Sequence, residues 1–187
     1  MRGLYGEDLI IVFTERNMSK QKKAGTSAEE LTNSLLKTGN PGRVVVSRIK
    51  SGSDLLRSLQ EIIEEKELKS GVILSGVGLL SSVKLRNCKT LPDEFPITDQ
   101  NRSYLSFEKP SEIIGISGNV GVADGKPLIH AHLTLSYIED EAIKVIGGHM
   151  IEGSMVFGFA EVIIMELTEI EMIKIIDKET KTLQYFS

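Results

Sequence analysis

The amphipathic segment at residues 55–68 constrains the fold most, because it is the clearest helical pattern in a chain otherwise rich in strand patterns. Leu55, Leu59 and Ile63 recur at helical spacing, and polar and charged side chains cover the other side. Ser51, with Asp54 three residues later, is typical of the capping arrangement that begins a helix. A helix with one apolar face has to bury that face against another layer, so the fold must supply a sheet for it.

Segments with the apolar, β-branched character of strands surround this helix. We expect strands at residues 44–50, 72–78, 83–87, 113–122, 128–137, 142–146 and 155–167, and a last hairpin of 170–176 with 182–186. The pattern predicts an α+β fold, which is a single domain with a mostly antiparallel β-sheet and one main amphipathic helix.

Length and composition favour one folded domain preceded by an extension. The chain has 187 residues, of which 41% are hydrophobic and 26% charged, the balance of an ordinary globular protein. We expect the compact domain at residues 43–187 and a weakly ordered N-terminal extension at residues 1–42. Within the extension, residues 27–36 suit a short helix and residues 39–42 a linker.

Composition also bears on the compartment. No apolar run approaches the roughly 20 residues of a membrane span, and the first 14 residues lack the order of a secretory signal. The single cysteine, Cys88, excludes an intramolecular disulfide and indicates a cytoplasmic protein. We expect Cys88 to be a small packed residue, while Arg86 beside it remains open as a functional candidate.

All three histidines of the chain lie within residues 130–149. In residues 128–137 apolar and polar side chains alternate, so His130 and His132 are expected on one face of a strand. If the following hairpin turns at Glu139 and Asp140, His130 lies directly opposite His149. The Gly147-Gly148 pair could supply a bulge that changes this register, or could open room beside a bound ion.

Three histidines without a fourth protein ligand form an open zinc site, in which water or a small-molecule ligand completes the coordination. Zinc lowers the pKa of bound water to about 7 and polarises carbonyl groups. Glu152 and Glu161 are the nearest acidic residues and the candidate catalytic carboxylates, although both could equally be exposed or paired side chains. The alternative for the histidines is a structural or incidental cluster.

Residues 48–167 contain, in this order, the motifs Arg-Ile-Lys-Ser-Gly-Ser-Asp-Leu, Ser-Gly-Val-Gly, Val-Lys-Leu-Arg, Glu-Ile-Ile-Gly-Ile-Ser-Gly-Asn, Asp-Gly-Lys-Pro-Leu-Ile-His-Ala-His and Gly-Gly-His-Met-Ile-Glu-Gly. Together these motifs resemble the plants-and-prokaryotes conserved (PPC) domain. The resemblance implies a homotrimer of single α+β domains. It also implies metal binding at His130, His132 and His149, as in prokaryotic members. The fold and the three histidines are similar, further, to those of acetolactate decarboxylase.

Two functions remain open from the sequence. The first is zinc-dependent chemistry on a small molecule, and the second is a DNA-associated or protein-interaction module with a structural metal. The net charge of -4 disfavours DNA as a partner. The Arg-Gly-Arg-Pro element that plant PPC proteins insert into the minor groove does not occur in the chain. Whether the protein is an enzyme is left undecided.

Overall fold

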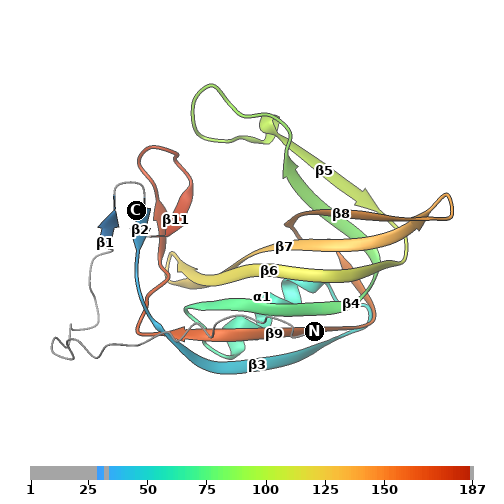
Figure 1. The fold of residues 1–187 in the computed structure, drawn as a ribbon, viewed down its shortest axis with the longest axis horizontal. Coiled ribbons are helices and arrows are strands. Elements are labelled where there is room, and N and C mark those ends of the chain that lie inside the picture. The colour runs from blue at the N-terminus through green and yellow to red at the C-terminus, as the bar shows by residue number, and fades with distance from the viewer. Residues whose placement is uncertain (1–28, 32–33, 186–187) are drawn as a thin grey trace, which may run out of the picture.

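The computed structural model describes residues 29–31 and 34–185, and its main feature is one antiparallel sheet of seven strands. The strand order is β3-β9-β4-β6-β7-β8, and β5 pairs with β4 (Figure 1). The elements are β3 (Asn40–Lys50), α1 (Leu55–Glu65), β4 (Gly71–Cys88), β5 (Arg102–Phe107), β6 (Ser111–Ala123), β7 (Lys126–Glu139), β8 (Ala142–Met150) and β9 (Met155–Thr168). The predicted α+β class, with a mostly antiparallel sheet and one helix, is confirmed.

Two short hairpins accompany the large sheet. β1 (Glu29–Leu31) pairs with β2 (Ser34–Leu36), and β10 (Lys174–Ile176) pairs with β11 (Leu183–Tyr185). The second hairpin agrees with the prediction, but the helix expected at residues 27–36 is wrong where the structure describes it. A helix of that length is marginal by itself, whereas a hairpin satisfies backbone groups between its two strands. Most of the expected N-terminal extension, residues 1–28 and 32–33, lies outside the described residues.

The helix forms where its apolar period predicts it and buries Leu55, Leu59 and Ile63 completely. Its N-cap is Asp54, whose Oδ1 accepts a hydrogen bond from the backbone N–H of Arg57 at 2.9 Å. Ser51, which we expected in that role, instead accepts a hydrogen bond from the N–H of Gly158. Asp54 also accepts from the N–H of Gly153, so it joins the helix to the turn between β8 and β9.

No helix among the described residues has the length and apolarity needed to cross a bilayer.

The large sheet has two different faces. The helix face carries the core, including Leu133, Leu135 and Val162, against which α1 packs. The opposite side, which we call the open face, carries the side chains that alternate with these. Along β3, for example, Val45 packs against the core while Val44 and Val46 are exposed. Whatever this domain binds through its sheet therefore meets the open face.

β4 is a single bent strand of 18 residues, although the sequence suggested two separate ones. Its first part pairs with β6 and β9, with register shifts on the β9 side, and its last part pairs with β5 and β8. Gly78, at φ 153° beside one of the shifts, lies so close to Ala160 that a Cβ there would clash. The β4–β5 arm therefore rises above the sheet opposite the β10–β11 hairpin, with β6 and β7 between them (Figure 1).

Leu59 provides a test of the helix-on-sheet core. Replacing it with alanine, Leu59→Ala, should lower the free energy of unfolding by about 2–5 kcal/mol, because a fully buried side chain leaves a cavity. The measurement is urea unfolding followed by circular dichroism. Glu61→Ala, an exposed position on the same helix, should change the free energy by less than about 0.5 kcal/mol. Equal losses in the two variants would contradict this account of the core.

Candidate metal centre

Alternation along β7 places two histidines on the open face. Ile129, Ala131 and Leu133 are buried on the helix face, so the residues between them, His130 and His132, project from the other side. Both histidines are exposed. Because the apolar residues are fixed in the core, the strand cannot slip by one residue without burying both imidazoles. The core therefore determines where these two side chains point.

The third histidine comes from β8, in a register that differs from the predicted one. His149 lies opposite His132, whereas we expected it opposite His130. The turn falls at Asp140 and Glu141, which have φ of 50° and 60°, as a two-residue turn of the I′ kind requires. The register is thus displaced by two residues. A displacement of two keeps every side chain on its face, so His149 still joins the other two.

The glycines before His149 do not form a bulge, which was one of the two roles considered for them, since the β7–β8 ladder runs without a register shift. A Cβ on Gly148 would lie 2.6 Å from Oδ1 of Asn87, on the arm of β4. The Nδ2 of Asn87 donates a hydrogen bond to the carbonyl of Gly147 at 3.0 Å. The glycines therefore allow β8 to approach β4 closely, beside the histidines.

The three imidazoles are arranged as ligands of one ion. Their ring centroids are 5.4 Å apart for His130 and His132, 4.9 Å for His130 and His149, and 5.3 Å for His132 and His149. One nitrogen from each ring lies within 4.8 Å of the others. Three imidazoles that share a tetrahedral zinc ion, at about 2.0–2.1 Å per nitrogen, have ring centroids roughly 5 Å apart. The residues present therefore fit a metal ion that is bound by three histidines.

The surroundings favour neutral imidazoles, which is the form that binds metals. Burial lowers the pKa of His149 to about 4, and the positive charge of Arg86 contributes to the shift. Although the His130 side chain is exposed, neighbouring groups partly desolvate its ring and lower its pKa, with a contribution from the charge of Lys174. Both rings are therefore uncharged near pH 7, and each has a nitrogen lone pair available for a metal ion.

Arg86 is the residue beside the histidines whose position the sequence did not predict. It lies directly opposite His149, because the last part of β4 pairs with β8. The sequence singled out Arg86 only as a neighbour of Cys88 and gave no sign of that pairing. Cys88 itself is exposed, contrary to the prediction that it packs, and its thiol donates to the carbonyl of Thr90 at 3.1 Å.

The two candidate carboxylates lie elsewhere. Glu152 forms an exposed ion pair with Arg57 of α1 at 2.7 Å, in the turn after β8. Glu161 lies on β9, opposite Arg48 of β3 and Val77 of β4. Among the described residues, the cluster that could hold a metal contains the three histidines and neither glutamate. A catalytic role for Glu152 or Glu161 stays a prediction from the sequence.

Comparisons with known proteins agree with the fold described above. A family model described as the Plants and Prokaryotes Conserved (PCC) domain matches residues 36–168. Over 127 residues the chain is 31% identical to the bifunctional protein GlmU of Synechococcus sp. (strain JA-3-3Ab). That match includes 68% of this chain but 18% of the relative, so the chain spans less than a fifth of the length of the curated relatives it matches.

Solved structures show the same architecture. A metal-containing protein from Archaeoglobus fulgidus is 25% identical with a TM-score of 0.65, and the match covers 80% of this chain and 97% of that one. A protein of Bacteroides thetaiotaomicron, provisionally named a DNA-binding protein, is 18% identical with a TM-score of 0.62 over the same shares. The second likeness is evidence for the fold alone.

The shifted pKa of His149 can be tested directly. In the metal-free protein its imidazole should titrate near pH 4, below the ordinary value of 6.5, because burial and Arg86 disfavour the charged ring. The unfolded chain then takes up its proton first as the pH falls, so stability should decline between pH 6.5 and pH 4 through this group. NMR titration of the ring, assigned by its loss in His149→Gln, measures the pKa. A midpoint at 6.5 or above would contradict the prediction.

Proposed function

The chain belongs to the Plants and Prokaryotes Conserved domain family. On that premise we propose that it binds a metal ion and that this ion in turn binds a small molecule. In this proposal His130, His132 and His149 bind one divalent ion, for which zinc is the first candidate. The small molecule occupies the remaining coordination position of that ion. The observation that carries the proposal is the convergence of three nitrogen ligands within 4.8 Å on one face of the sheet.

The donor set supports an open rather than a closed site. Structural zinc sites have four protein ligands, whereas sites with three and an exposed position admit water or a substrate. Two of the three rings are exposed, and no described cysteine or carboxylate completes the set. The printed description of the Archaeoglobus protein as metal-containing is consistent with this proposal.

The chemistry divides between the ion and the chain. Bound zinc would supply Lewis acidity, by which it polarises a carbonyl group or lowers the pKa of a bound water. The chain supplies ligand orientation, because β7 and β8 hold the imidazoles in fixed register. It also supplies a cavity of about 210 Å³ beside His132 and His149, where the small molecule would bind. A cytoplasmic location, inferred from the lone cysteine, forms part of the same proposal.

Elemental analysis tests the metal site. Protein purified without chelator should carry one zinc ion per chain, and His132→Ala should reduce the content at least tenfold, because two imidazoles hold zinc far more weakly than three. Ser136→Ala, on the same face of β7, should leave the zinc content unchanged. Zinc content that is equal in all three proteins would contradict the proposed ligands.

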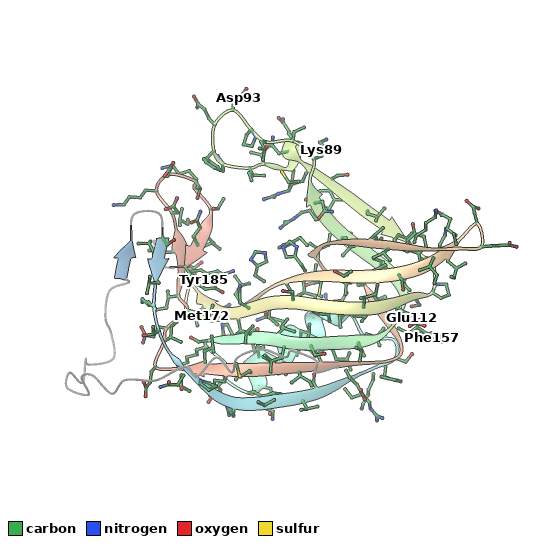
Figure 2. All side chains as sticks on the ribbon, in the orientation of Figure 1. Lys89, Asp93, Glu112, Phe157, Met172 and Tyr185 are labelled. Carbon is green, nitrogen blue, oxygen red and sulfur yellow. The ribbon has the colours of Figure 1, made fainter. Side chains whose placement is uncertain are left out.

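We also propose that the domain assembles as a homotrimer through the open face. The proposal rests on the apolar patch, defined as Val44, Val46, Leu74, Val77, Phe157 and Phe159, all of which are exposed. These residues come from β3, β4 and β9, away from the histidines on β7 and β8. Figure 2 labels Phe157 at the end of the sheet remote from Tyr185. An apolar surface of this kind is typical of a contact with another protein surface, and a second copy of the chain is the occupant we propose.

Light scattering tests the assembly. The wild-type protein should have three times the 20.6 kDa mass of one chain. Val46→Asp should release monomers, because it buries a charge in the apolar contact while leaving the monomer intact at a position that is 73% exposed. Ile143→Asp, equally exposed but at the β7–β8 turn, should remain trimeric. A monomeric wild-type protein would refute the proposal.

The alternative function is a DNA-associated or protein-interaction module in which the metal is structural. This alternative is supported by the name of the Bacteroides protein, whose 18% sequence identity is evidence for the fold alone. The net charge of -4 opposes it. Retention on duplex DNA at low salt that weakens steeply at higher salt would favour this alternative over the small-molecule site.

A further inference from the structure

The cavity beside the histidines gathers positively charged side chains in its walls. Its walls include Arg86, Arg102, His132, His149 and Thr182, and none of the described residues lining it is an aspartate or glutamate. A cavity with basic walls and no acid in them favours an anionic ligand, because such a ligand supplies the missing charge. A neutral molecule would gain no such charge complementarity from the two arginines.

Arg86 is the central group of this cavity. It is half-buried and lies opposite His149 in the β4–β8 ladder. Among the described residues no carboxylate forms an ion pair with its guanidinium, whereas Arg43 and Arg57 each pair with a glutamate. The carboxylate of Asp99 pairs with Arg102, and the charge of Arg86 acts on it without forming an ion pair. The planar donor fork of arginine matches the oxygens of a carboxylate or a phosphate.

Arg102 and Lys174 add charge on two sides. Arg102 lies opposite Cys88 in the β4–β5 ladder, and its Nη1 donates to Asp99 at 3.0 Å on the solvent side. Lys174 is only 7% exposed, forms no ion pair with a described carboxylate, and lies over the ring of Tyr185 at 4.7 Å. Its charge contributes to lowering the pKa of His130, after the larger effect of burial.

The β10–β11 hairpin brings Lys174 to the site by a specific contact. The hydroxyl of Tyr185 donates to Oδ1 of Asn119 at 2.8 Å, and Asn119 pairs with His130 in the β6–β7 ladder. Figure 2 shows Tyr185 where the hairpin approaches the sheet. Thr182, in the loop of the same hairpin, reaches the cavity wall. The hairpin lies beyond residue 168, where the family match ends, so its contribution is a property of this chain's own residues.

We propose that Arg86, supported by Arg102 and Lys174, binds a small oxyanion, either a carboxylate or a phosphate group, beside the three histidines. The proposal extends the proposed function, since the same ligand would offer another oxygen to the metal's open position. At about 210 Å³ the cavity is smaller than the roughly 300 Å³ at which pockets for drug-sized ligands begin. The ligand is therefore a molecule of a few carbon atoms or a simple phosphate compound.

Calorimetric titration with oxalate and, separately, with inorganic phosphate tests the subsite on zinc-loaded and on metal-free full-length protein. Arg86→Gln should weaken binding at least tenfold, because it removes a charge from the cavity wall. Lys174→Met should weaken binding several-fold, because it removes a positive charge that acts on His130. Arg48→Gln, an exposed arginine on β3, is the matched control and should bind as the wild type does. The zinc content and the circular dichroism spectrum of each variant show that fold and metal site persist. Comparing the two anions identifies the ligand as a carboxylate or a phosphate.

The outcomes separate this proposal from the metal site. Loss of anion affinity in Arg86→Gln with unchanged zinc content supports it. Anion binding that Arg86→Gln leaves unchanged, or its absence from the wild-type protein in both metal states, overturns it and leaves the zinc site standing. If the wild-type chain takes up no zinc, the proposed function fails. Arg86-dependent anion binding by the metal-free protein would still support the subsite.

Discussion

The two-residue period of β7 is the constraint on which the site depends. One face of this strand supplies Ile129, Ala131 and Leu133 to the core, and burial of those side chains fixes the direction of His130 and His132. The buried face of the strand therefore determines the side of the sheet from which both imidazoles project.

The sequence predicts most of what depends on period and little of what depends on pairing between distant strands. The helix at Leu55 to Glu65, the final hairpin and the shared face of the histidines all follow from local alternation. The predicted partner of His149 was wrong by two residues, but its predicted face was right. A shift by an even number of residues keeps a side chain on the same face of the sheet. β5 was missed because most of its side chains are exposed, so its sequence has no apolar alternation. Arg86 reaches His149 through a ladder between β4 and β8 that no local pattern reveals.

The open face divides into two regions of opposite chemistry. The apolar patch on β3, β4 and β9 has hydrophobic side chains in contact with water, whereas the region of β7, β8 and the β4–β5 arm carries histidines and arginines. Such a division allows a single sheet to support association and ligand binding without competition for the same surface. The cavity also lies on the face that would meet another subunit, so assembly would affect how a ligand reaches the cavity.

The β10–β11 hairpin contributes Lys174, Thr182 and Tyr185 to the surroundings of the histidines while remaining outside the region shared with the family model. The large sheet and its three histidines lie within the matched region, and the hairpin lies beyond it. The segment that leads into this hairpin is bonded to β6, because the N–H of Val122 donates to the carbonyl of Met172. Changes in the exposed loop of the hairpin would therefore alter the surroundings of the histidines while the contact with the large sheet persists. A scaffold organised in this way can acquire new specificities at its periphery while its interior stays the same.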